Sequence, residues 1–208
     1  MDATVTVQSV ESVGPDTVAV TFDSPDEFDA KPGQFVRLTA DVGGESESRF
    51  YTVSSPDTDG SFETTVGLDG GEFAASLADL EPGDTVDVSG PFGEDYYEGE
   101  PRAVVLAGGP GIGPAVAIAE AALDAGNEAA VVYQSDAPAH TDRLDRVRDR
   151  GGSVVVTADD VDDAVADAVT GVDGETAFVY GFAEFVDDAT AALTDAGFDG
   201  ETKVENFG

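Results

Sequence analysis

Two patterns of apolar residues divide the chain near its midpoint. In residues 1–90, apolar and polar residues alternate with a period of two over short runs, and proline and glycine separate the runs. Such alternation is typical of antiparallel strands that bury one face. It predicts six strands, at 4–10, 17–22, 34–38, 49–53, 62–68 and 85–88, with one short helix at 73–80. Six short strands at this spacing predict a small antiparallel barrel or sandwich.

The second half follows a different rhythm, in which wholly apolar runs alternate with helix-like segments. The apolar runs predict strands at 103–107, 129–133, 153–157, 176–180 and 202–205. Between them we expect helices ending near 125 and 150, a helix starting near 161, and one at 183–196. This alternation predicts an α/β domain with a parallel sheet covered by helices on both faces. The acidic connection 94–101 then separates two domains, 1–98 and 99–208.

A glycine-rich turn follows the first apolar strand of the second half. Its sequence, from Gly108 to Pro114, is Gly-Gly-Pro-Gly-Ile-Gly-Pro. A turn between a buried strand and a helix presents backbone N–H groups and the positive end of the helix dipole, which suit a nucleotide pyrophosphate. Its spacing is not the G-x-G-x-x-G of the common dinucleotide fold, so a turn that binds nothing stays an alternative.

A second segment with candidate chemistry lies in the first half, where Arg49, Phe50, Tyr51 and Thr52 follow one another. Arg49 is one of only seven arginines in a strongly acidic chain. A strand that presents a guanidinium, an aromatic ring and a hydroxyl can hold a phosphate, a planar ring and a polar atom of one ligand. The alternative is a strand with one exposed arginine and a core tyrosine.

Seven short motifs occur in order along nearly the whole chain. They are Pro-Gly-Gln-Phe-Val at 32–36, Arg-Phe-Tyr-Thr at 49–52, Gly-Glu-Phe at 71–73, Gly-Pro-Phe-Gly at 90–93, the glycine-rich turn at 108–114, Val-Tyr-Gly at 179–181 and Glu-Asn-Phe-Gly at 205–208. This order resembles the ferredoxin–NADP reductase superfamily. The resemblance implies an antiparallel six-stranded flavin-binding barrel followed by a parallel-sheet domain that binds a nicotinamide nucleotide.

The resemblance also implies roles along the flavin. Arg49 is expected to contact the flavin pyrophosphate, and Phe50 belongs to the same binding strand. Tyr51 is expected to lie against the isoalloxazine ring, and the Thr52 hydroxyl to hydrogen-bond near flavin N5. Phe207 is expected to cover the other face of the flavin until nicotinamide displaces it.

Further cofactor contacts are implied on both sides of the domain boundary. The adenine side of FAD is expected to pass Val66, Gly67 and Leu68. Backbone N–H groups of one turn and helix start are expected to meet the pyrophosphate, at Gly70, Gly71, Glu72, Phe73 and Ala74. The nicotinamide nucleotide is expected to be lined by Gly108, Gly109, Gly111, Ile112 and Gly181.

Three departures from the family pattern qualify this resemblance. Tyr180 stands before Gly181 where the family usually has a cysteine beside the reacting nicotinamide, so a bulky side chain could hinder or re-aim that ring. Gly67 stands where the family often has an arginine, and Ala74 where it commonly has a serine or threonine. The last two changes each remove a contact to FAD and predict weaker binding.

The choice of nucleotide is predicted from Asp136, which follows the second strand of the second half. An adenosine ribose is expected there. A carboxylate suits ribose hydroxyls and repels a 2′-phosphate, and no lysine or arginine precedes Arg143 in this segment. NADH is therefore favoured over NADPH, unless Arg143 folds back toward the ribose.

Charge and composition narrow the possible partners. The 208 residues include 44 acidic residues and 9 lysines and arginines, for a net charge of -35. This charge repels nucleic acid and anionic membranes, and its spread over the chain is similar to that of cytoplasmic proteins from salt-accumulating halophiles. No apolar run reaches the roughly 18 residues of a membrane span, and Met1–Val5 does not look like a secretory signal, so a cytoplasmic location is expected.

Residue types exclude several chemistries. The chain has no cysteine, which excludes disulfides, cysteine-ligated zinc, an iron–sulfur cluster on this chain and thiol catalysis. Its one histidine argues against histidine-rich metal sites and Ser-His-Asp triads. We assign no metal site. His140 is expected to face solvent without a role. Arginines at 143, 146, 148 and 150 are expected to form a solvent-facing, salt-bridged helix face with the nearby aspartates.

The predicted function is transfer of hydride between a nicotinamide nucleotide and FAD, with electrons passing to a separate acceptor such as ferredoxin. Tyr51, Thr52, Tyr180 and Phe207 are the residues expected at the reacting rings. Two alternatives remain open. The first is an NAD(P)H:flavin reductase that releases flavin as a substrate. The second is a non-catalytic flavin-binding subunit that passes electrons within a complex, which the unusual Tyr180 keeps possible.

Overall fold

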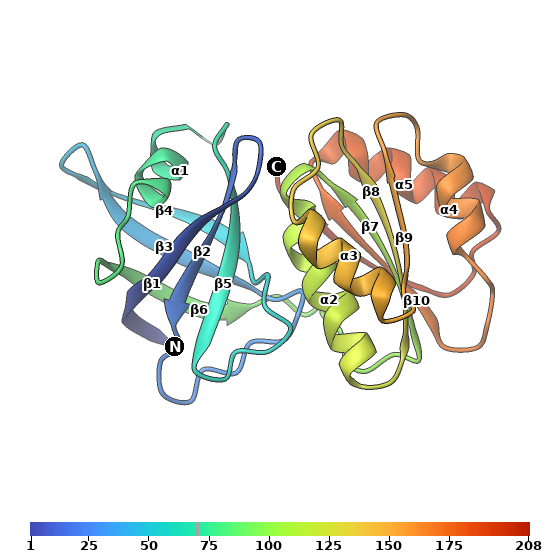
Figure 1. Cartoon of the computed structure of the whole chain (residues 1–208), viewed down its shortest axis with the longest axis horizontal. Coiled ribbons are helices and arrows are strands. Elements are labelled where there is room, and N and C mark those ends of the chain that lie inside the picture. The colour runs from blue at the N-terminus through green and yellow to red at the C-terminus, as the bar shows by residue number, and fades with distance from the viewer. Residues whose placement is uncertain (70) are drawn as a thin grey trace.

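The computed structural model describes residues 1–69 and 71–208, and it consists of a barrel and a helix-covered sheet lying side by side (Figure 1). The predicted Gly70 lies outside the described residues. The barrel strands are β1 (Asp2–Gly14), β2 (Thr17–Asp23), β3 (Phe35–Val42), β4 (Glu45–Thr52), β5 (Ser61–Gly67) and β6 (Thr85–Phe92). Helix α1 (Gly71–Ala78) follows β5 and precedes β6 in the chain.

All pairings within the first sheet are antiparallel, in the order β4-β3-β6-β1-β2-β5. An isolated bridge between Val53 and Thr64 joins the two ends of this order and closes the barrel. The inward positions of each strand fill one apolar core, which also receives Phe73, Ala74 and Leu77 from α1. The predicted six-stranded barrel is therefore confirmed, with α1 covering part of its interior.

The second sheet is parallel and five-stranded, in the order β11-β10-β7-β8-β9. Its strands are β7 (Arg102–Gly108), β8 (Glu128–Gln134), β9 (Ser153–Thr157), β10 (Glu175–Gly181) and β11 (Glu201–Asn206). The helices are the 3-10 turn η1 (Gly109–Gly111), α2 (Ile112–Asp124), α3 (Thr141–Asp149), α4 (Asp162–Ala168) and α5 (Ala183–Asp195). One apolar cluster lies under α2 and α3, and a second lies under α4 and α5. The predicted α/β fold is confirmed.

The winding of this sheet reverses between β7 and β10. The chain moves outward from β7 through β8 to β9 on one side, then returns to place β10 and β11 on the other side of β7. In open parallel sheets, ligands bind at the carboxyl ends of the strands beside this switch point. The C-terminus lies at this end, between the two domains (Figure 1).

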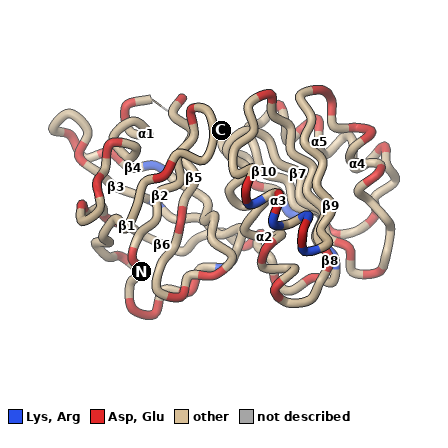
Figure 2. The backbone as a smooth tube through the Cα atoms, in the orientation of Figure 1, with Lys and Arg blue, Asp and Glu red and all other residues tan. Residues whose placement is uncertain are grey.

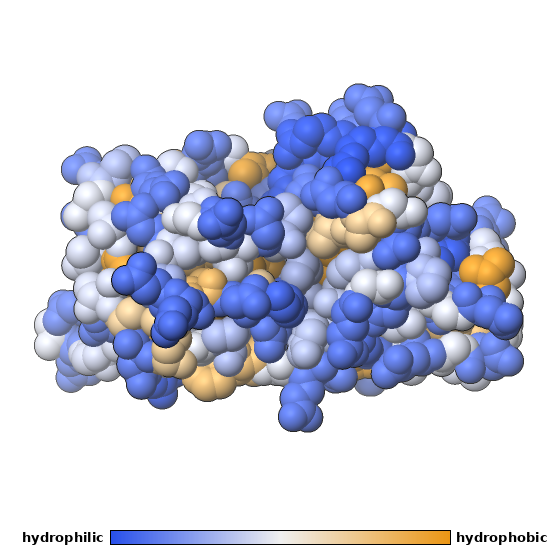
Figure 3. Space-filling view, turned by 90° about the horizontal axis from the view of Figure 1, so that it is seen from below, coloured by the Kyte–Doolittle hydropathy of each residue, from blue (hydrophilic) through white to orange (hydrophobic). Residues whose placement is uncertain are grey.

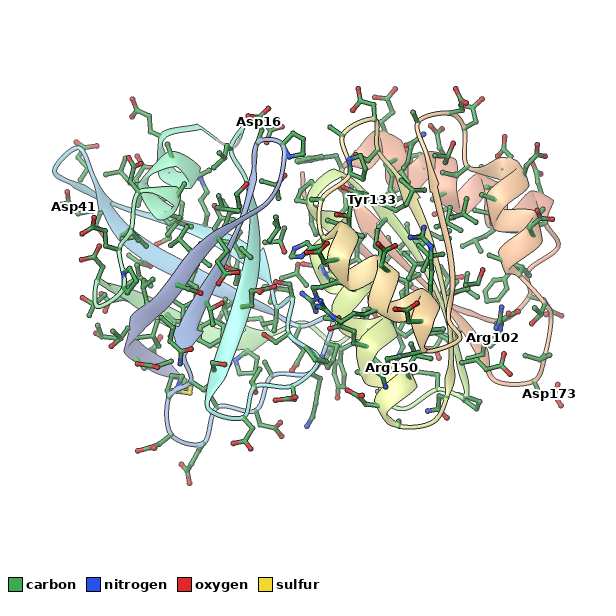
Figure 4. All side chains as sticks on the ribbon, viewed as in Figure 1. Asp16, Asp41, Arg102, Tyr133, Arg150 and Asp173 are labelled. Atoms are coloured by element: carbon green, nitrogen blue, oxygen red, sulfur yellow. The ribbon has the colours of Figure 1, made fainter. Side chains whose placement is uncertain are left out.

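The opposite, amino end of the second sheet is held by an ion network around Arg102. Arg102 is labelled in Figure 4 and lies far from the C-terminus marked in Figure 1. Arg102 Nε donates to the buried Glu175 at 2.8 Å, and its Nη1 donates to Glu128 at 2.7 Å. Glu175 also accepts backbone N–H bonds from Thr170 and Gly171. A buried carboxylate is stable only with such partners, so this network accounts for the buried charge of Glu175 at the amino end of the sheet.

The interface between the domains contains polar contacts and buries His140, which the sequence predicted to face solvent. His140 is 3% exposed, and its Nε2 lies 2.8 Å from the Thr65 hydroxyl on the barrel. Its backbone N–H donates to the Val13 carbonyl at 2.7 Å. Burial and two neighbouring guanidinium groups lower the pKa of His140 to about 3, so the ring is neutral. The prediction that His140 faces solvent is wrong because the loop before α3 packs against the barrel.

Arg143 is also largely buried, although the sequence predicted it on a solvent-facing side of its helix. Its guanidinium bonds Glu120 of α2 at 2.6 Å and Glu63 of β5 at 2.9 Å, and it is 11% exposed. The other arginines of this helix region meet expectation more closely, since Arg148 pairs with Asp145 at the surface and Arg150 pairs with Asp124. Figure 2 shows acidic positions spread over both domains, with basic positions gathered on α3.

In the described part of the chain, the structure holds no helix that is long and apolar enough to cross a membrane. The face seen in Figure 3 is largely hydrophilic, with small separate hydrophobic patches. Among the described residues there is no group of three or more potential metal ligands.

Candidate functional site

A cavity of about 640 Å³ lies where the barrel meets the carboxyl end of the second sheet. One wall is the end of β4, and the other is built by the turn after β7, the residue after β10 and the chain end. Its lining residues are Phe35, Ser48, Arg49, Phe50, Tyr51, Thr52, Thr65, Gly67, Asp69, Pro110, Pro114, Phe182, Glu205, Asn206, Phe207 and Gly208. The topology thus brings segments about 150 residues apart to one cavity.

The barrel wall carries the guanidinium and the ring that were predicted to act together. Arg49 is about half exposed and pairs with Glu47 at 2.9 Å. The Tyr51 ring stacks on Phe73 of α1, with ring centroids 6.2 Å apart and planes 18° apart. Burial raises the pKa of Tyr51 to about 12, so its hydroxyl stays protonated. This wall offers a cation beside a fixed aromatic surface.

The two walls are joined by a hydrogen bond from Thr52 to the chain end. The Thr52 hydroxyl donates to Glu205 Oε1 at 3.2 Å. Burial, together with the nearby Asp95 charge, raises the pKa of Glu205 to about 7, although the Thr52 bond opposes this rise. The cavity therefore contains a carboxyl group that gains or loses a proton near neutral pH.

The glycine-rich turn borders the cavity through Pro110 and Pro114. Gly109 has φ of 54°, a conformation that side chains with a Cβ rarely adopt. At Gly111 a Cβ would clash with the Tyr180 backbone carbonyl. The turn therefore requires Gly109 for its own backbone shape and Gly111 for its close approach to β10, and it directs the start of α2 toward the cavity.

Tyr180 does not reach the cavity. Its side chain is 1% exposed in the core under α2, and its hydroxyl donates to the Asp95 backbone carbonyl at 3.3 Å. A Cβ on Gly33 would lie 2.5 Å from that hydroxyl, so the barrel approaches it closely. In this structure Tyr180 joins β10 to the connection between the domains.

Several other predicted contact residues turn their side chains into the cores. The buried side chains are those of Val66, Phe73, Ala74 and Ile112. Only backbone groups of these residues can face a ligand. Gly71 and Glu72 are exposed at the start of α1, next to the cavity-lining Asp69. Gly67 lines the cavity, whereas Leu68 lies in the turn after β5, where its N–H donates to Asp16.

None of the predicted nucleotide contacts lines the cavity, although all lie at the carboxyl edge of the sheet: Gly108, Gly109, Gly111, Ile112, Asp136 and Gly181. Gly108 and Gly181 end β7 and β10, and a Cβ on either would clash with the Phe185 ring. Asp136 is exposed, two residues beyond the end of β8. Its place fits a ligand extending along the sheet edge away from the cavity.

Phe182 and Glu205 are two of the cavity residues that were given no role in the sequence analysis. Phe182 follows the Val-Tyr-Gly motif directly, and Glu205 opens the C-terminal motif. Phe182 is 47% exposed, and an aromatic residue directly after a buried strand in an acidic chain was an available signal. The Glu205 carboxyl could not be separated from 43 other acidic residues without the contact to Thr52.

A closed barrel followed by a parallel sheet, with a cavity at the switch point, defines a two-domain nucleotide-binding fold. Residues 4–97 match the family model of the oxidoreductase FAD-binding domain. The whole chain shares its fold with a ferredoxin NADP+ reductase from Neisseria gonorrhoeae solved with FAD and NADP, at a TM-score of 0.80 and 18% identity, over 100% of this chain and 99% of that one. The predicted resemblance to the ferredoxin–NADP reductase superfamily is therefore confirmed.

Other similar proteins agree with this placement. The FAD/NAD-binding domain of a nitric oxide dioxygenase from Vibrio cholerae superposes with a TM-score of 0.84 at 18% identity, over 99% of this chain and 98% of that one. A probable dihydroorotate dehydrogenase B (NAD(+)) electron transfer subunit from Methanopyrus kandleri is 40% identical over 90 residues, which are 43% of this chain and 32% of that protein. NADH-cytochrome b5 reductase 1 from Laccaria bicolor is 32% identical over 124 residues, which are 56% of this chain and 40% of that protein. The matches to the Methanopyrus and Laccaria proteins thus span only about a third to two fifths of the length of each.

Proposed function

We propose that the chain is an FAD-dependent NAD(P)H oxidoreductase that passes electrons to a separate acceptor. The observation that carries this proposal is the single cavity that joins the Arg49–Thr52 wall to the carboxyl edge of the parallel sheet. In this proposal residues 1–98 hold FAD and residues 99–208 hold the nicotinamide nucleotide. The matched FAD-binding family model over residues 4–97 supports the first assignment.

The donor set of the cavity fits FAD. A planar ring is accommodated by the apolar surfaces of Tyr51 and Phe207, and a polar ring atom by the Thr52 hydroxyl. Diphosphate is accommodated by Arg49, whose pair with Glu47 is half exposed and therefore easily exchanged for a phosphate contact. The Arg49 guanidinium lies 5.6 Å from the ring centroid of Phe73 in α1, so a phosphate bound to Arg49 would lie near the start of this helix, where backbone N–H groups favour an anion. FAD bound here supplies a group that accepts hydride.

The protein's own contribution is alignment and exclusion of water. Tyr51 is fixed by its stack on Phe73, and the chain end is fixed by β11 pairing with β10. Holding two rings in a near-attack arrangement removes much of the entropic barrier to transfer. The Thr52 hydroxyl and the Glu205 carboxyl place a donor and a proton-exchanging group at the same point of the cavity.

NADH is the favoured nucleotide. Arg143 is held by Glu120 and Glu63, which leaves it unavailable to a 2′-phosphate near Asp136. The Asp136 carboxylate can accept hydrogen bonds from ribose hydroxyls and repels a phosphate. The test is the ratio of kcat/KM for NADH to that for NADPH, and a tenfold advantage for NADPH overturns this choice.

The acceptor is proposed to be a separate molecule such as a ferredoxin. The sequence holds no cysteine with which to bind an iron–sulfur cluster of its own. The Methanopyrus relative is described as an electron transfer subunit, which supports a protein partner. The proposed location is the cytoplasm, where a nicotinamide nucleotide is at hand, and the acidic surface fits a salt-rich interior.

A second candidate is a flavin reductase that releases its flavin. Gly67 lines the cavity where the resemblance expects an arginine. Without that guanidinium, the hold on a diphosphate is weaker. A non-catalytic flavin-binding subunit is the third possibility.

The deciding experiment is a visible spectrum of the chain purified in high salt, before and after NADH. We expect a flavin spectrum that NADH bleaches without added flavin. Bleaching only with added free flavin, with equal affinity for FAD, FMN and riboflavin, favours the flavin reductase. A bound flavin that neither NADH nor NADPH reduces favours the non-catalytic subunit.

A further inference from the structure

Phe182 occupies a position at the cavity that no sequence motif explains. It is the first residue after β10, at the switch point of the sheet, and it is 47% exposed although it is a large apolar side chain. The residues around it fix its direction. The Phe185 ring fills the space against Gly108 and Gly181, while Phe182 has an extended backbone just before α5 and lines the cavity.

The ring of Phe182 contacts the ring of Phe207 on the chain end. Their centroids are 6.1 Å apart and their planes meet at 90°, an edge-to-face arrangement that aromatic pairs prefer. The Phe207 N–H donates to the Gly181 carbonyl at 2.9 Å, next to Phe182 in the chain. Phe207 is therefore held by a backbone bond and by this aromatic contact, and its side chain also packs against the buried apolar cluster under α2.

The same ring also lies close to the glycine-rich turn. A Cβ placed on Gly109 would lie 4.0 Å from Phe182 Cε2, at ordinary contact distance. Phe182 thus stands between the turn and Phe207, both of which border the cavity region. A nicotinamide ring that enters beside this turn has to pass the aromatic pair.

We infer that Phe182 is a positioning residue that braces Phe207 over the flavin side of the cavity and so sets the ease of nicotinamide entry. The inference rests on the proposed function. If nicotinamide binds only when Phe207 has moved aside, the apparent dissociation constant equals the intrinsic one divided by the fraction of open chains. An aromatic pair of this geometry changes that fraction by roughly two- to tenfold.

The test compares the FAD-loaded full chain with Phe182→Ala, Phe207→Ala and the double variant, and Val172→Ala is the control. Val172 is also an exposed apolar residue, in the loop before the amino end of β10. In Phe182→Ala we expect the dissociation constant for NAD+ to fall about two- to tenfold, and oxygen to reoxidise the reduced protein faster. Phe182→Leu, which keeps the apolar bulk without the ring edge, should give a smaller change.

The double variant separates bracing from direct contact. If Phe182 acts through Phe207, removing Phe182 changes nothing further once Phe207 is alanine. An unchanged or higher dissociation constant in Phe182→Ala, or an undiminished effect in the Phe207→Ala background, overturns the inference.

A second measurement keeps this test distinct from that of the proposed function. Hydrogen exchange of the C-terminal peptide, read without nucleotide, should quicken in Phe182→Ala and stay unchanged in Val172→Ala, because the Phe207 N–H bond to Gly181 opens more often. Equal exchange in wild type and Phe182→Ala overturns the brace. Faster exchange in a chain that NADH fails to reduce instead overturns the proposed function and leaves the contact standing.

Discussion

The Glu205 carboxyl makes the stability of this protein depend on pH in a way that can be calculated. Its pKa is raised to about 7 in the folded chain, against an ordinary value of 4.5. A raised carboxyl pKa means that the folded state holds the proton more tightly than the unfolded state. The contribution to stability is therefore fully present below about pH 4.5 and is lost as the pH rises through about 7.

The size of the effect follows from the two pKa values. Their difference corresponds to about 3 kcal/mol in the free energy of unfolding, lost between roughly pH 5 and pH 8. Glu205→Gln keeps the shape of the side chain and removes its titration. We therefore expect the difference in unfolding free energy between wild type and Glu205→Gln to change by that amount over this range. Taking a difference cancels the general repulsion among the other acidic groups.

The assay is denaturant unfolding at fixed high salt, at several values between pH 5 and pH 8. Glu201→Gln is the matched control, because Glu201 begins the same strand and is exposed. Thr52→Val provides a second arm. Losing the Thr52 donor removes a bond that favours the ionised carboxylate, so the midpoint of the pH effect should rise by about one pH unit. Parallel pH curves for wild type and Glu205→Gln would refute the reasoning.

Three further outcomes are expected. Exposed like charges repel more as screening falls, so a net charge of -35 predicts that the protein unfolds at low salt. The far-UV circular dichroism signal should be lost when KCl is dialysed from molar to about 0.05 M. An unchanged spectrum and melting temperature would contradict the salt-adapted interpretation. Arg49→Ala should erase most of the preference for FAD over FMN in binding titrations, whereas Tyr51→Ala should weaken the binding of both flavins alike. An intact preference in Arg49→Ala would show that Arg49 does not bind the diphosphate. Arg143→Ala should cost about 3 kcal/mol in denaturant unfolding, because it removes the close guanidinium from two largely buried carboxylates and leaves Glu120 only a 3.7 Å pair with Arg146. Arg148→Ala at a surface pair should cost under about 0.5 kcal/mol, and equal costs would count against the interdomain ion pair.

The order of strands and helices could be predicted from the sequence because local patterns determine it. Alternation of apolar and polar residues defines strands with one buried face, and apolar runs such as 103–107 define strands buried on both. Each predicted range falls on one strand of the two sheets, although β1, β3, β4 and β6 are longer than predicted. The turn from Gly108 to Pro114 was also readable, since Gly109 adopts a positive φ that favours glycine.

What a side chain contacts depended on tertiary structure, because contacts join residues far apart in the chain. Tyr180 faces the core and not the cavity, since its strand packs under the connection between the domains. His140 is buried because its loop meets the barrel, which no local pattern encodes. Glu205 and Phe182 gain their chemistry from Thr52 and Phe207, and only the meeting of barrel wall, sheet edge and chain end decides those partners. The sequence by itself determined the two scaffolds, and the packing of one against the other decided the site.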